Sequence, residues 1–153
     1  MPSSNFSREI AVKSDSARCW AVLTDVPRLV EWVSILDDAK EVSHLQRYEA
    51  VLMDRLGPFK LKADLDIVVS DVEEGKRIRV QANGEDRQVA SRIGVNALLV
   101  LEPHEDGSTT ITVEGTYEVI GRVATLGAGM IRTKANKVMD EFFAKATAEL
   151  GAA

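Results

Sequence analysis

The chain has 153 residues, of which 45% are hydrophobic and 28% are charged, and its formal net charge is −5. This length fits a single domain, residues 1–153, and the negative charge argues against a nucleic-acid partner. The lone cysteine, Cys19, excludes an intramolecular disulfide and a thiolate metal cluster. Without a secretion signal or a stretch of about 20 apolar residues that would cross a bilayer, we expect a cytoplasmic protein.

The chain begins with a predicted strand at residues 5–13, where apolar side chains recur at every second position. Capping residues and a proline then predict two short helices. The first carries Cys19 and Trp20, and the second runs through Val30 and Trp32. We therefore expect two small helices between the first strand and the rest of a sheet.

From residue 38 onward, alternating hydrophobicity predicts an antiparallel meander. The predicted strands cover residues 38–44, 46–55, 59–70, 76–83, 88–102 and 109–120. We predict turns at Gly57-Pro58, Glu74-Gly75-Lys76, Asn83-Gly84 and Asp106-Gly107.

The segment from Gly121 to Gly151 predicts one long amphipathic helix. Its expected buried stripe consists of Ile131, Ala135, Val138, Met139, Phe142 and Ala146. The first part differs, because Val123, Leu126 and Met130 lie off this stripe among several glycines. Two interpretations stay open: the glycines allow close contact with the sheet, or this part is pliable and faces a ligand, a membrane surface or a partner.

Together these elements predict an α+β domain in which a seven-stranded curved antiparallel sheet wraps around a long C-terminal helix. One helix rich in alanine and glycine would not fill such a sheet, so we predict a cavity between sheet and helix. The predicted ligand-binding residues are Trp32, Leu61, Ala63, Leu65, Ile78, Val80, Ile93, Val95, Val113, Tyr117, Met130, Lys134 and Val138. The alternative for each residue is that it fills the core or, for Lys134, that it lies at the surface.

The sequence offers no independent case for an enzyme, because no nucleophile, metal or nucleotide motif occurs in it. His104 falls in a predicted turn, and His44 lies at a strand edge without a second ligand at metal-binding spacing. The acidic run at residues 83–86 is interpreted as an exposed turn. We therefore predict no catalytic residue, no metal site and no cofactor.

Three segments carry a family resemblance: REIAVKSDSARCWAVLTDVPRL at 8–29, LGPFKLKADLDI at 56–67 and YEVIGRVATLGAGMI at 117–131. They resemble the START-like (SRPBCC) helix-grip superfamily, which includes polyketide cyclases, plant allergen-type hormone binders and lipid-transfer domains. Within it, the chain is most similar to the carbon monoxide dehydrogenase G-subunit family. Residues 31–36 depart from that family's usual Leu-Pro-Gly turn, and Trp32 is more similar to the cyclase and quinone-binding branches.

The resemblance implies three hypotheses about function. The first is non-catalytic binding of a lipid-like or quinone-like hydrophobic molecule. The second is an enzyme similar to polyketide cyclases or dehydratases, with Tyr117 and Trp32 positioning the substrate. The third is an accessory protein that recruits a molybdenum hydroxylase such as carbon monoxide dehydrogenase, with an oxidoreductase or membrane contact through Val123, Leu126 and Met130.

Overall fold

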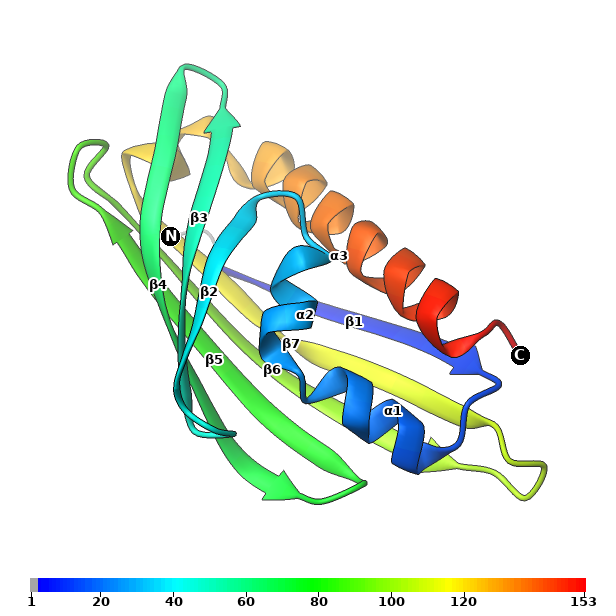
Figure 1. Cartoon of the computed structure of the whole chain (residues 1–153). Coiled ribbons are helices and arrows are strands. Elements are labelled where there is room, and N and C mark those ends of the chain that lie inside the picture. The colour runs from blue at the N-terminus through cyan, green and yellow to red at the C-terminus, as the bar shows by residue number, and fades with distance from the viewer. Residues whose placement is uncertain (1–2) are drawn as a thin grey trace.

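A computed structural model describes residues 3–153, so Met1 and Pro2 of the predicted domain lie outside the described residues. Seven antiparallel strands form one curved sheet in the order β1-β7-β6-β5-β4-β3-β2 (Figure 1). The strands are β1 (Ser3–Val12), β2 (Leu36–Ser43), β3 (Arg47–Leu56), β4 (Phe59–Glu73), β5 (Arg77–Asp86), β6 (Ser91–Pro103) and β7 (Thr109–Gly121). The α+β architecture with a sheet curved around a terminal helix is confirmed.

The inner face of the sheet, which faces the terminal helix, follows from the alternation in the sequence. In β4, Leu61, Ala63 and Leu65 are buried while the charged residues between them are exposed. Register then joins inward positions across the sheet, from Tyr48 through Ile67, Ala82 and Val95 to Tyr117. Because every second residue faces the same side, one apolar face forms across the strands.

Two short helices, α1 (Ser16–Leu23) and α2 (Val26–Glu31), connect β1 to β2 as predicted. The Asp15 side chain accepts a hydrogen bond from the Arg18 backbone N–H at 2.9 Å, and Asp25 does the same for Arg28 at 3.4 Å. Each carboxylate satisfies an N–H group that the first helical turn leaves free. Helix α1 contacts β6 and buries Cys19 at that end of the inner face.

The turn predicted at Asn83-Gly84 was wrong, because both residues lie inside β5. The strand continues to Asp86, and residues 87–90 form the turn instead. Gly84 allows close packing, since a Cβ there would come within 2.6 Å of the end of the Leu65 side chain and 3.1 Å of the Asp64 carbonyl oxygen. A glycine in a strand can therefore indicate close packing as well as a turn.

The continuous helix predicted from Gly121 to Gly151 was also wrong at its beginning. Residues Arg122–Leu126 form a short 3-10 helix, η1, and α3 covers Ala128–Leu150. Gly121 has φ +102 and Gly127 has φ +93, which are values that side-chain-bearing residues rarely adopt. The two glycines thus break the expected helix and turn its first part into a separate element.

Helix α3 crosses the inner face and is fixed at both ends (Figure 1). Before its first turn, the Leu126 side chain lies against Gly57 in the β3–β4 turn. After its last turn, the Gly151 carbonyl accepts a hydrogen bond from the Lys13 N–H at 2.8 Å, and Ser14 Oγ donates to the Leu150 carbonyl at 2.8 Å. These contacts attach the two ends of α3 to opposite ends of the sheet.

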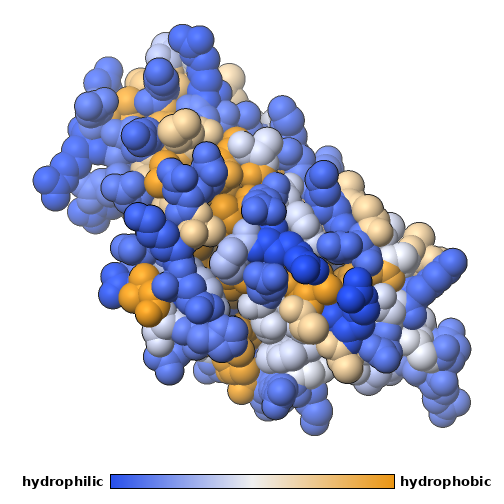
Figure 2. All heavy atoms as spheres, viewed as in Figure 1, coloured by the Kyte–Doolittle hydropathy of each residue, from blue (hydrophilic) through white to orange (hydrophobic). Residues whose placement is uncertain are grey.

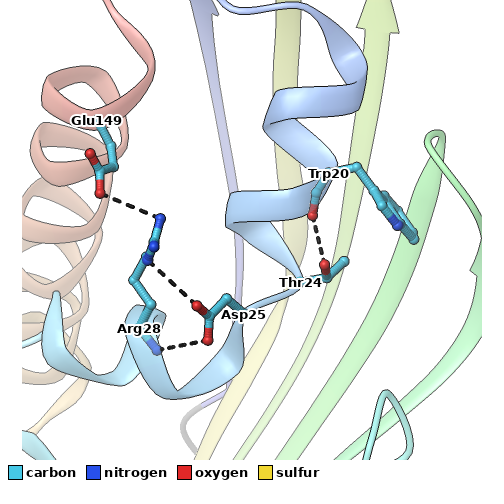
Figure 3. A network of polar contacts seen from close by, with 5 residues as sticks. All are labelled: Trp20, Thr24, Asp25, Arg28 and Glu149. Atoms are coloured by element: carbon cyan, nitrogen blue, oxygen red, sulfur yellow. Dashed lines mark hydrogen bonds and ion pairs between the residues drawn. The ribbon is translucent and has the colours of Figure 1, made fainter.

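Polar contacts also hold α3 along its two sides. On one side Arg8 of β1 lies 2.7 Å from Asp140. On the other, Arg28 of α2 is 3.5 Å from Glu149 and 3.5 Å from the Asp25 carboxylate, as Figure 3 shows. All these side chains are substantially exposed, so each pair contributes little to stability. Their effect is to set the position of the helix over the sheet.

The buried side of α3 agrees in part with the predicted stripe. Ile131 and Ala146 are buried as expected, while Ala135, Val138, Met139 and Phe142 are half-buried. Phe143 and Leu150 are buried as well, although the predicted stripe omitted them.

Candidate functional site

The inner face divides into two sections that differ in how completely they are covered. The sealed section lies on β3 and β4, where the inward apolar side chains are buried, apart from Phe59 at the turn between the strands. Its residues are Tyr48, Ala50, Leu52, Leu56, Leu61, Ala63, Leu65, Ile67 and Val69. This section is ordinary protein core.

The open section lies on β5, β6 and β7. Some inward side chains of these strands, such as Ile78, Leu99 and Val119, are buried. The others remain only half-buried and define the open section, namely Val80, Ala82, Ile93, Val95, Ala97, Val113 and Tyr117. On the helix, Lys134, Ala135, Val138, Met139 and Phe142 are half-buried too. Because fully packed interiors exclude water from such side chains, their partial exposure indicates that α3 covers this section incompletely.

The two ends of the open section are closed by different elements. At the α1 end, Leu101 and Ile111 are buried with Cys19 in the core. At the η1 end, Val123 is fully buried, and its N–H donates to Ser91 Oγ at 3.0 Å. The half-buried part of the face is thus bordered by buried residues at both ends of the strands.

The predicted ligand-binding residues are divided between the buried core and the open section. Leu61, Ala63 and Leu65 belong to the sealed section, and Ile78 is also buried in the core. Trp32 is buried against Phe142, with ring centroids 5.5 Å apart. The half-buried residues around the open section are Val80, Ile93, Val95, Val113, Tyr117, Lys134 and Val138, whereas Met130 is 46% exposed.

An ion pair lies between α3 and the inner face near the η1 end. Lys134 Nζ is 2.9 Å from Asp54 Oδ2, and the two side chains are 27% and 12% exposed. Asp54 follows the same alternation as Leu52 and Leu56, so it points inward from β3. Its Oδ2 is buried and receives no hydrogen bond of good geometry, which leaves the ammonium as its polar contact.

The prediction overlooked Asp54, although the sequence contains a signal for it. A carboxylate occupies an inward position of an alternating strand, between two leucines. Buried carboxylates need a partner, so a charged residue on an apolar face indicates either an interior ion pair or a site.

Beside the open section, the α2–β2 connection approaches α3. Ser34 Oγ donates to the Glu141 carboxylate at 3.0 Å, near the contact between Trp32 and Phe142. Figure 2 shows apolar atoms recessed among polar side chains where this connection, β3 and α3 approach one another. At the α2–β2 connection, α3 is therefore held by an exposed hydrogen bond and by the contact between Trp32 and Phe142.

Three open hollows, of about 590, 540 and 540 Å³, lie mainly on the outer face of the sheet. The first is lined by polar side chains such as Gln81, Asn83 and Asn96, although Ile93 and Val95 also border it. Because these hollows are open and of mixed polarity, they do not provide the enclosed apolar surface that a hydrophobic ligand needs. The open section of the inner face is the better candidate.

Other reactive groups have local structural partners. Asp86 is buried and accepts hydrogen bonds from the backbone of Lys62 and Gln88. Burial raises the pKa of the Cys19 thiol, which packs under α1. His44 contacts Glu41 at 2.8 Å, and among residues 3–153 no group of three His, Cys, Asp or Glu side chains could hold a metal ion.

The partner surface predicted at Val123, Leu126 and Met130 needs a correction. Val123 is fully buried and Leu126 is half-buried against Gly57, so neither forms an exposed docking surface. The break at Gly127 separates Val123 and Leu126 from α3. Val123 belongs to the core and Leu126 packs against it. Met130 alone of the three is exposed.

The family model for the G subunit of carbon monoxide dehydrogenase (CoxG) matches residues 9–151, which is nearly the whole chain. The chain belongs to the CoxG family. The match includes both sections of the inner face and the entire α3 helix, so the resemblance predicted from three segments extends over the domain. No curated protein matches the chain.

Solved structures share the fold of this CoxG family member. A conserved protein from Geobacillus kaustophilus is 24% identical, with a TM-score of 0.82 over 96% of this chain and 95% of that chain. A START superfamily protein from Mycobacterium smegmatis is 13% identical, with a TM-score of 0.69 over 93% and 92%. A protein from Thermus thermophilus is 15% identical, with a TM-score of 0.62 over 96% and 94%. The predicted START-like helix-grip fold is confirmed. Within residues 3–153, no helix combines the length and apolarity needed to cross a membrane.

Proposed function

We propose that this chain binds a small apolar molecule, lipid-like or quinone-like, between the open section of the sheet and α3. The observation that carries the proposal is the difference within one apolar face. The inward apolar side chains on β3 and β4 are buried, apart from Phe59, whereas seven of those on β5 to β7 remain half-buried. Half-buried apolar side chains that line a bounded space gain by excluding water when a ligand covers them.

The energetics favour such a ligand. Covering apolar surface contributes about 25 cal/mol per Å², so burying about 300 Å² would contribute roughly 7 kcal/mol before the costs of association. Association costs at least about 4 kcal/mol, so this burial alone supports only roughly millimolar or weaker binding of a purely apolar molecule. Tighter binding would need a polar contact as well.

Native mass spectrometry of the purified protein, with extraction into organic solvent and a titration with the neutral dye Nile red, tests this proposal. Wild type should carry an extractable apolar molecule or bind the dye. Val95→Trp, which fills the open section, should lose binding. Val68→Trp is the matched control, since Val68 is 37% exposed on the outer face. A folded wild type that carries nothing and binds no dye would contradict the proposal.

The family suggests a setting for this binding. We propose that the chain acts as an accessory protein of a carbon monoxide dehydrogenase-type molybdenum hydroxylase, as the family description supports. A pull-down with purified hydroxylase should retain the chain. Met130→Glu should weaken that contact and Arg132→Glu serves as a second exposed position on the same helix. Failure of wild type to bind would remove the accessory role but leave ligand binding standing.

A further inference from the structure

We propose that the Asp54–Lys134 ion pair makes the site selective for apolar molecules with a neutral carbonyl head and excludes those with a free carboxylate. This inference rests on the proposed ligand binding and names the class of ligand. Asp54 points inward from β3, and Lys134 reaches it from α3 at 2.9 Å.

Asp54 lies on β3 in the sealed section, and the pair is connected to the proposed binding space through α3. Lys134 and Val138 are four residues apart on α3, so they occupy the same face of the helix. Val138 is half-buried, as are the inward side chains of the open section. A ligand covering Val138 would therefore have one end within reach of Lys134.

The Lys134 ammonium has N–H donors that Asp54 does not occupy. It carries three N–H groups, and its 2.9 Å contact with Asp54 Oδ2 is an ion pair without good hydrogen-bond geometry, so at most one N–H is occupied. A ligand carbonyl oxygen accepts such a proton without changing the charge of the site. A plain hydrocarbon would cover the ammonium without replacing its hydration, which costs free energy.

A free carboxylate is unfavourable for a different reason. Asp54 already neutralises Lys134, and its side chain is only 12% exposed. A ligand carboxylate would place a second negative charge beside it where solvent screens poorly, and like charges at a desolvated contact repel strongly. The ion pair thus excludes acids while it accepts neutral acceptors.

Three probes with similar hydrocarbon length separate these effects: methyl undecyl ketone, laurate and dodecane, each measured by displacement of Nile red. In wild type, the ketone should bind about tenfold more tightly than laurate. Asp54→Asn leaves Lys134 without its counter-charge, so this preference should reverse in favour of laurate. Asp64→Asn, an exposed carboxylate on the outer side of β4, is the matched control and should behave as wild type.

Lys134→Met would leave Asp54 unpaired and so can destabilise the fold. The double variant Asp54→Asn with Lys134→Met removes both charges, so its affinity for dodecane should equal its affinity for the ketone. Lys137→Met, an exposed lysine on the same helix, is its control. Equal ketone-to-laurate ratios in wild type, Asp54→Asn and the double variant would overturn the inference while binding itself stands. No binding of dye or probes to folded wild type would overturn the proposed function instead.

Discussion

The β3–β4 section and the β5–β7 section of the inner face carry the same apolar alternation but are covered differently. On β4, Leu61 and Ala63 are each 1% exposed. On β5 and β6, Ala82 and Val95 occupy equivalent inward positions and stay half-buried. Alternation therefore determines which side chains face inward, whereas the path of α3 and η1 determines which of them form core and which can line a site.

Thiol labelling should give the largest contrast between the two environments. Cys19 is fully buried, and burial raises the pKa of its thiol, so it should react with a thiol reagent only when the structure opens. Ala82→Cys in a Cys19→Ala background should react at least about 100-fold faster at neutral pH, because the open section admits small molecules. Both rates are measured by absorbance without denaturant. Similar slow rates for both thiols would mean that the section is closed.

Truncation of one side chain in each section should separate their contributions to stability. Leu61→Ala should lower the free energy of unfolding by about 2–5 kcal/mol, since it leaves a cavity in packed core. Val113→Ala in the open section should lower it by about 1 kcal/mol or less, because its neighbours are already partly hydrated. Urea denaturation measures both. Equal losses would show that the two sections are packed alike.

Added bulk should have contrasting effects on stability and binding. Ala63→Phe forces a ring into sealed core and should cost about 1–3 kcal/mol of stability. Ala82→Phe should cost less than about 1 kcal/mol, since the ring enters unfilled space, yet it should abolish binding of Nile red. Thermal unfolding measures the stability of both variants, and titration with Nile red measures their binding. Retained dye binding by Ala82→Phe would place the site elsewhere.

Removal of the polar contacts that attach α3 should have the smallest effects on the free energy of unfolding. Ser14→Ala removes the hydrogen bond to the Leu150 carbonyl and should cost about 1 kcal/mol. Arg8→Ala removes an exposed pair with Asp140 and should cost about 0.5 kcal/mol, less at high salt. Urea denaturation at two salt concentrations distinguishes them. A large, salt-dependent loss for Arg8→Ala would mean that this pair holds the helix along its length.

Much of the fold was predictable because its signals are local. Alternation in β4 and β7 and the capping residues before α1 and α2 depend on neighbours in sequence. The glycines were harder to interpret, since Gly84 meets Leu65 of another strand and Gly121 approaches the Ala90 carbonyl. In the sequence, a glycine needed for a contact between distant segments looks the same as a glycine in a turn or a helix.

The candidate site was predictable only in part, for the same reason. Inward residues such as Val95 and Tyr117 follow from parity, but their partial exposure depends on how far α3 stands from the strands. Lys134 was predicted as a polar contact for a ligand, whereas its partner Asp54 was overlooked. Finding it required attention to the one position where β3 places a charge among inward leucines.

The most direct test is an NMR titration of methyl-labelled protein with methyl undecyl ketone. Chemical-shift changes should be largest for methyl groups of Val80, Ile93, Val95 and Val113 in the open section. Methyl groups of Leu61, Leu65 and Ile78, which are buried in the core, should change little. Changes confined to those buried residues or to the outer face, or no changes at all, would contradict binding between the open section and α3.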